Sequence, residues 1–226
     1  RADEPVKRVS LADGKQTWLL TRYEDIRKTL NQAGISVSRK IPDFPASGSP
    51  GRRSKLLTET MLAKDGEEHV RLRRVVTRAF MPKKVATMRP GLSAKAERLC
   101  DEYAAAGSGA DFYAMVAGPL TSEMINELLG VPSTDVDEVL RVINILVSIS
   151  TPDEVIEREL DDFERFFEVV IEEKRKNRGD DPLTDLIDRF DEGGMTFPEL
   201  ISFVFLLISA GYDTSANTIT LSILLL

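Results

Sequence analysis

The stretch that decides the fold is the last one, residues 196–226, which reads TFPELISFVFLLISAGYDTSANTITLSILLL. Thr196 and Glu199 form a capping box, which predicts a helix from Phe197 to Leu226. The apolar residues of this helix surround its axis instead of forming one stripe, as in helices that are buried on all sides. Such a helix would be about 45 Å long and would run through the middle of a domain.

A polar segment interrupts this apolar helix at Ala210-Gly211-Tyr212-Asp213-Thr214-Ser215-Ala216-Asn217. Gly211 costs roughly 1 kcal/mol against alanine, and the Thr214 hydroxyl can hydrogen-bond to the carbonyl of Ala210, so that together they permit a local bulge. A widened helix beside an acid, Asp213, and a hydroxyl is a place to bind a small ligand and relay protons. The alternative is a kinked core helix in which Asp213 pairs with a basic residue elsewhere, and the residues alone do not decide between the two.

An earlier segment, Glu68 to Phe80, is also a predicted helix, and its core-facing stripe consists of Leu72, Val75, Val76, Ala79 and Phe80. His69 and Arg73 are one turn apart at the edge of this stripe. A partly desolvated guanidinium requires an anion, so Arg73 should meet a protein carboxylate, which the pattern favours, or the carboxylates of a bound cofactor. On the opposite side, we expect Arg71, Arg74 and Arg78 to be solvated.

Outward from these two helices, the rest of the chain is mainly helical with a small β region. A hairpin is predicted from Val6 to Leu11 and Gln16 to Leu20, with Ala12-Asp13-Gly14-Lys15 as its turn. A second capping box, Thr21 with Glu24, predicts a helix over Tyr23 to Ala33 that Gly34 ends in the left-handed conformation. A long loop follows from Ile41 to Ser54. The further predicted helices are Ser93 to Ala106, Leu120 to Leu129, Asp135 to Ile149, Pro152 to Asn177 and Pro182 to Phe190.

Composition narrows the classes of partner and site. The 37 acidic residues outnumber the 30 basic ones, and the net charge of −7 opposes binding to nucleic acid and to anionic membranes. With one cysteine, Cys100, and one histidine, His69, neither a disulfide framework nor a zinc site of the usual kind is possible. The apolar run Leu200 to Tyr212 is shorter than the roughly 20 residues that cross a bilayer. We therefore expect a cytoplasmic protein.

Two segments taken together, Asp65 to Arg74 (DGEEHVRLRR) and Ala210 to Ser215 (AGYDTS), resemble signature segments of the cytochromes P-450, and they occur in that family's order. The resemblance implies a cytochrome P-450 fold that is incomplete and ends within the long central oxygen-binding helix. Residues 1–226 would then be a partial domain. Its parts would be an N-terminal hairpin and helix (1–40), a substrate-region loop (41–60) and a helical region (61–226).

The resemblance also implies where the cofactor, haem b (iron protoporphyrin), would bind. The segment around His69 and Arg73 is similar to the one whose histidine and arginine hold the haem propionates. Phe80 should lie against the haem. Ala210 and Gly211 should also contact it, with Gly211 marking the opened helical turn.

The same resemblance places the chemistry on the last helix. Asp213 and Thr214 match the acid and hydroxyl that deliver protons where oxygen is activated. Leu206, Ser209 and Ala210 should face the substrate cavity. The implied activity is that of a haem-dependent monooxygenase, an oxidoreductase that hydroxylates or epoxidises an apolar small molecule with dioxygen.

Some features depart from the family's pattern. Asp-Gly-Glu-Glu precedes His69 where Asp-Pro-Pro-Glu is commoner, and the Glu-x-x-Arg pair and the cysteine-ligand loop are absent. Cys100 has no glycine-rich approach and is expected to be a buried structural cysteine. We therefore expect no axial metal ligand within this chain, and an inactive fragment if the chain stands alone.

The resemblance further implies a ferredoxin and its reductase as electron donors, and substrates drawn from secondary metabolism. Arg71, Arg74 and Arg78 could dock an acidic ferredoxin, although a merely solvated basic face is the simpler interpretation. An alternative of a different class is a cofactor-free helical interaction module, or an inactive truncated relative.

Overall fold

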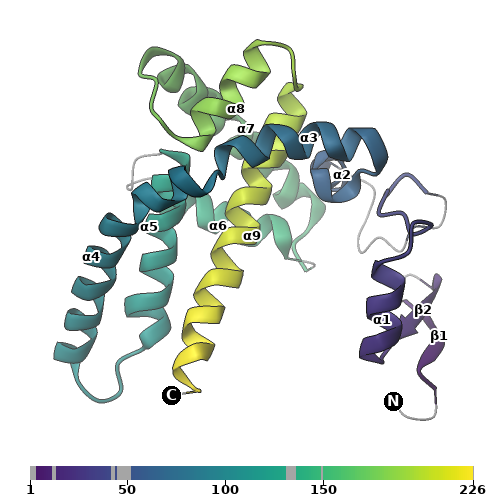
Figure 1. The fold of residues 1–226 in the computed structure, drawn as a ribbon, viewed down its shortest axis with the longest axis horizontal. Coiled ribbons are helices and arrows are strands. Elements are labelled where there is room, and N and C mark those ends of the chain that lie inside the picture. Colours follow the sequence, from purple (N-terminus) through teal and green to yellow (C-terminus); the bar gives the residue numbers. More distant parts are fainter. Residues whose placement is uncertain are drawn as a thin grey trace.

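A computed structural model of the chain describes residues 4–11, 14–41, 44, 52–130, 136–148 and 150–225. Apart from one hairpin it is helical (Figure 1), which confirms the predicted fold class. The strands are β1 (Val6–Ser10) and β2 (Gln16–Leu20), and the short turns of helix are η1 (Met61–Ala63, 3-10) and η2 (Tyr113–Ala117, π). The α-helices are α1 (Tyr23–Leu30), α2 (Arg52–Glu59), α3 (Gly66–Ala79), α4 (Pro82–Ala106), α5 (Gly118–Leu129), α6 (Val136–Val147), α7 (Asp153–Lys176), α8 (Pro182–Asp191) and α9 (Phe197–Ile223).

The N-terminal hairpin forms as predicted, with antiparallel β1 and β2 paired so that Arg8 lies opposite Trp18. The following helix differs from the prediction, because α1 ends at Leu30 and has no side-chain cap. The Thr21 hydroxyl donates instead to the carbonyl of Pro5, 3.4 Å away in the hairpin. Gly34 is not among the glycines with positive φ, so the predicted left-handed stop is wrong.

The region between the hairpin and α3 holds an unexpected helix. Most of the predicted loop Ile41 to Ser54 lies outside the described residues, and α2 begins at Arg52. Pro82 opens α4, where its fixed φ and missing N–H suit the first turn. This helix is therefore much longer than the predicted Ser93 to Ala106.

The core lies around the N-terminal half of α9. Leu200, Ile201 and Ile208 are at most 2% exposed, and they pack with buried residues of α5, α6, α7 and α8. The capping box of Thr196 and Glu199 is present as predicted. Burial on all sides holds only for this half of the helix. Toward its C-terminus α9 runs beside α5 (Figure 1), and apolar side chains such as Leu221 become exposed.

By length and composition alone, α9 could cross a membrane. Core helices of soluble proteins meet the same criterion, and nearly half of the most apolar window of α9 is buried within the fold. This helix is therefore weak evidence for a membrane span, in line with the prediction of a buried helix.

Candidate functional site

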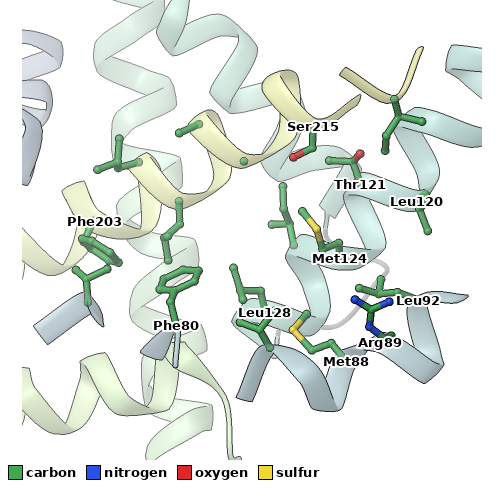
Figure 2. A pocket seen from close by; sticks show the side chains of 18 of the residues that line it. Phe80, Met88, Arg89, Leu92, Leu120, Thr121, Met124, Leu128, Phe203 and Ser215 are labelled. Atoms are coloured by element: carbon green, nitrogen blue, oxygen red, sulfur yellow. The ribbon is translucent and has the colours of Figure 1, made fainter. Parts of the chain in front are cut away.

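A large apolar cavity of about 820 Å³ opens between α3, α4, α5 and α9. Figure 2 shows side chains from these helices converging on it. Its lining includes Phe80, Met88, Leu92, Met124, Leu128 and Phe203. Pockets of this size that are mostly apolar are the usual binding sites for organic ligands.

Some of the predicted site residues line this cavity. They are Leu206, Ala210 and Gly211 on α9, and Phe80, the residue directly after α3. Leu206 and Ala210 are one helical turn apart and therefore share a face. The structure thus brings the predicted cofactor-binding and substrate-binding residues of two helices to one cavity, although 130 residues separate them in sequence.

Ser209 is placed differently from the prediction. It is not among the residues that line the cavity, and its hydroxyl donates to the carbonyl of Phe205 at 2.8 Å. The hydroxyl is therefore satisfied within the helix, so Ser209 does not present a free polar group to a substrate in this cavity.

Asp213 and Thr214 are exposed on α9, one turn beyond Ala210, and do not line the cavity themselves. The Thr214 hydroxyl donates to the carbonyl of Ala210 at 2.6 Å, as predicted. Among the described side chains none forms an ion pair with Asp213, which argues against the alternative of a paired core aspartate.

The predicted opening of the helix at Gly211 is not seen, because α9 is continuous from Phe197 to Ile223. The Thr214 hydroxyl shares the Ala210 carbonyl without interrupting the helix. A Cβ on Gly211 would lie 3.7 Å from Cδ1 of Ile125. Gly211 therefore marks where α9 and α5 approach closely, not a widened turn.

On α3, His69 and Arg73 lie upstream of the cavity residues Val76 and Phe80. His69 is half-buried, and its Nδ1 is 3.0 Å from the carbonyl of Met61 in η1. Arg73 is exposed and forms no ion pair with any carboxylate of the described residues. The protein carboxylate that the pattern favoured for Arg73 is thus missing from this part of the chain.

Arg71 corrects the prediction of a wholly solvated basic face. Its Nη1 donates to the carbonyl of Gly194 at 3.0 Å, and its guanidinium forms an ion pair with Glu199. Burial raises the pKa of the Glu199 carboxyl, but hydrogen bonds from Arg71 and the Thr196 N–H outweigh burial and hold this pKa below its ordinary value. Arg74 is exposed, and the side chain of Arg78 lies outside the described residues.

The prediction from sequence missed the wall of the cavity that α5 forms. On α5, Leu120, Met124 and Leu128 recur every four residues, a spacing that signals one helix face but not what it faces. Thr121 also lines the cavity, near Ser215 in Figure 2. Its hydroxyl is buried and has no hydrogen-bond partner among the described residues, so it is a donor available to a ligand.

Cys100 was expected to be buried, but it is exposed on α4, and its neighbour Leu99 is buried instead. Adjacent helical residues point about 100° apart, so only one of them faces the core. Cys100 does not line the cavity, so the chain offers no cysteine ligand there.

Gly118, directly after the π-helix η2, is packed too closely for a larger side chain. A Cβ there would lie 3.1 Å from the carbonyl oxygen of Tyr113 and 3.2 Å from the hydroxyl of Tyr212, next to the polar segment of α9. We expect Gly118→Ala to lower the free energy of unfolding by about 1 kcal/mol through this crowding. Tyr212→Phe in the same chain should recover part of the loss.

Gly91 provides the matched control for Gly118. It lies within α4, and a Cβ there would meet nothing closer than the Glu127 carboxylate at 3.8 Å. Gly91→Ala should therefore be neutral or stabilising by up to roughly 1 kcal/mol. Urea unfolding checks both variants, and equal effects at Gly118 and Gly91 would contradict the packing argument.

Comparison with known proteins agrees with this geometry. The family model for Cytochrome P450 matches residues 107–226. A cytochrome P450 of Mycobacterium marinum is 30% identical to the chain over 228 residues, with 100% of this chain and 55% of that protein covered. Pentalenic acid synthase of Streptomyces avermitilis is 34% identical over 224 residues, covering 98% and 55%.

A solved structure gives the same result. The cytochrome P450 PksS of the Bacillus subtilis 168 bacillaene polyketide synthase superposes with a TM-score of 0.83 and 30% identity, covering 98% of this chain and 56% of that one. The chain thus spans about 55% of the length of the relatives it matches.

Proposed function

Because this chain belongs to the cytochrome P450 family, we propose that the protein is a haem-dependent monooxygenase acting on an apolar small molecule, with dioxygen and electrons from outside. The observation that carries the proposal is the apolar cavity between α3 and α9. It is flanked by the polar segment of α9 and by Arg73, which has no carboxylate partner in the described part of the chain. This arrangement can hold an apolar ligand with an anionic edge next to an acid and a hydroxyl.

The residues present fit one side of a haem. Arg73 carries a guanidinium without a carboxylate partner among the described residues, and His69 lies one turn before it, so the two would hold the propionates. Phe80, Ala210 and Gly211 would contact the ring within an apolar wall. Oxygen activation is the chemistry that haem supplies when bound. The thiolate ligand of its iron does not come from Cys100, which lies outside the cavity.

Asp213 and Thr214 would move protons. The carboxyl of Asp213 is exposed to solvent and forms no ion pair with the side chains that the structure describes. The Thr214 hydroxyl donates to Ala210 and keeps its lone pairs available to accept a hydrogen bond. Leu206 and Ala210 would bind the apolar substrate and exclude water from it.

Haem affinity tests the proposed role of Arg73, and Arg74 supplies a matched control. Both arginines are exposed on α3, but only Arg73 lies on the side of Val76 and Phe80. In the protein expressed from its complete gene, Arg73→Leu should speed haem transfer to apomyoglobin by about tenfold, since a charge-assisted hydrogen bond is lost. Arg74→Leu should leave the transfer rate near that of the wild type. Equal rates for both variants would contradict the assignment.

If Thr214 delivers protons, its replacement should uncouple the consumption of reducing equivalents from product formation. Thr214→Ala should divert reducing equivalents from product to hydrogen peroxide by an order of magnitude or so, which is the size of effect typical of a positioned proton donor. Oxygen uptake, peroxide and product measured together check this, and Thr218→Ala, one turn further along α9, is the control. Tight coupling in Thr214→Ala would contradict the proposed proton path.

Further parts of the proposal concern partners and location. We place the protein in the cytoplasm, with a ferredoxin and its reductase as electron donors. Since Arg71 is engaged by Glu199, Arg74 is the described exposed member of the three arginines left to contact such a donor. A secondary metabolite is the proposed substrate class, in keeping with relatives such as the mycinamicin IV hydroxylase/epoxidase of Micromonospora griseorubida.

A further inference from the structure

The ion pair of Arg71 and Glu199 joins the two helices that carry the candidate site. Both terminal nitrogens of Arg71 reach the carboxylate, and Nη1 also donates to the carbonyl of Gly194 in the turn before α9. The side chain of Glu199 is 8% exposed and that of Arg71 is 43% exposed. The contact therefore consists of a buried carboxylate held by a partly solvated guanidinium, a geometry that fixes orientation as well as distance.

Glu199 is also part of the start of α9. Its Oε2 accepts the N–H of Thr196 at 2.8 Å, and its own N–H donates to the Thr196 hydroxyl at 3.3 Å. The same carboxylate thus closes the capping box and binds α3. The first turn of α9 is therefore attached to α3 through one side chain.

Glu199 lies on the cavity side of α9. Phe203, Leu206 and Ala210 follow it at i+4, i+7 and i+11, a spacing that keeps them on one helix face, and all three line the cavity. From Glu199 to Ala210 the axial distance is about 16 Å of continuous helix. A rotation or shift at Glu199 is therefore carried along α9 to the polar segment.

Arg71 lies on the helix that forms the facing wall. It lies between His69 and Arg73 in sequence. Val76 of the same helix and Phe80, directly after the helix end, line the cavity opposite α9. In Figure 1, α3 crosses α9 near the N-terminal end of α9, where the ion pair lies. The pair thus sets the spacing of the two walls at one end.

We propose that Arg71 and Glu199 are positioning residues that fix the register of α9 against α3, so that the Ala210 to Thr214 segment faces the group held by His69 and Arg73. This inference rests on the proposed function for its consequence in catalysis. The structural part of the inference is that the spacing of the two cavity walls depends on one ion pair, and this part does not require haem.

The test uses the protein as purified after expression from its complete gene, with Nile red as a neutral apolar probe of the cavity. Glu199→Gln keeps an oxygen for the Thr196 N–H but removes the charge that holds Arg71. We expect its dissociation constant for Nile red to rise roughly fivefold or more, as for other coupled sites. Ala210→Phe, which fills the cavity, should abolish binding and so locate the probe.

Glu159 is the matched control. It is a buried carboxylate, 4% exposed, held by Arg141 (46% exposed) at 2.9 Å between α6 and α7, and it does not line the cavity. Glu159→Gln should lower stability as Glu199→Gln does but change Nile red affinity by less than about twofold, because distant sites act independently. Equal weakening by both variants, or none by Glu199→Gln, would overturn the proposal.

Two further measurements separate this inference from the proposed function. Arg71→Lys keeps the positive charge but loses the paired N–H donors of the guanidinium. The Nile red affinity of this variant should therefore lie between those of the wild type and Glu199→Gln. Haem transfer to apomyoglobin should be faster in Glu199→Gln than in Glu159→Gln. If the wild type binds no haem, the proposed function fails while the Nile red result still decides the role of the pair; if it binds haem and Nile red affinity is unchanged, only the pair's role fails.

Discussion

Replacing Phe167 with alanine should lower the free energy of unfolding by about 3–5 kcal/mol, which is the usual cost of truncating a buried aromatic side chain. Phe167 is 0% exposed in the middle of α7. Its ring centroid lies 4.8 Å from that of Phe163 and 5.0 Å from that of Phe166, so the variant loses two aromatic contacts as well as apolar burial. The loss is a large share of the stability of an ordinary domain.

Urea unfolding measures this effect, and Val169 provides the control on the same helix. Val169 is 63% exposed, so Val169→Ala should change the free energy of unfolding by no more than about 0.5 kcal/mol. The denaturant slope should stay the same in both variants, since a change in slope would indicate a change in the unfolded or native ensemble. A small effect of Phe167→Ala would mean that the core does not lie where α7 and α9 meet.

Lys174→Met should be about as destabilising, at roughly 3–5 kcal/mol, because it leaves a buried charge without its partner. Lys174 Nζ is 2.6 Å from Oδ2 of Asp181, and both side chains are 11% exposed. Asp181 also caps α8 by accepting the N–H of Thr184 at 2.9 Å. The variant would therefore weaken the junction of α7 and α8, and it would also leave the buried carboxylate of Asp181 without its cation.

The double variant Lys174→Met with Asp181→Asn separates the charge from the packing. Asparagine keeps the cap but carries no charge, so the double variant should be more stable than Lys174→Met alone. Lys176→Met is the control, because Lys176 pairs with Glu173 on the surface at 66% and 59% exposure, and such pairs contribute less than about 1 kcal/mol. Equal losses for Lys174→Met and Lys176→Met in urea unfolding would contradict the buried pair.

Some features that depend only on neighbours in sequence were predicted correctly. The Thr196 and Glu199 capping box forms, and the Thr214 hydroxyl reaches Ala210, because each partner is three or four residues away. The same kind of motif failed at Thr21, whose hydroxyl donates to the carbonyl of Pro5, the residue before β1. A local motif therefore predicts well only where no acceptor from elsewhere competes.

Features that depend on distant partners could not be predicted. Arg71 looked solvated because its partner Glu199 is 128 residues away. Cys100 was expected to be buried but is exposed, and its neighbour Leu99 is buried. The pattern of α4 alone does not say which face packs on the core. Phe80, Leu206, Ala210 and Gly211 were assigned through the family resemblance, and the cavity that joins them became visible only in the fold.

We propose that the cavity between α3 and α9 belongs to a haem-thiolate monooxygenase. The reduced, carbon monoxide difference spectrum of the protein expressed from its complete gene tests this assignment, with the 226-residue chain alone measured beside it. We expect a Soret band at the long-wavelength position typical of thiolate ligation for the complete protein, and none for the chain alone, whose Cys100 lies outside the cavity. A complete protein that binds no haem, or that shows only the short-wavelength band, would contradict it.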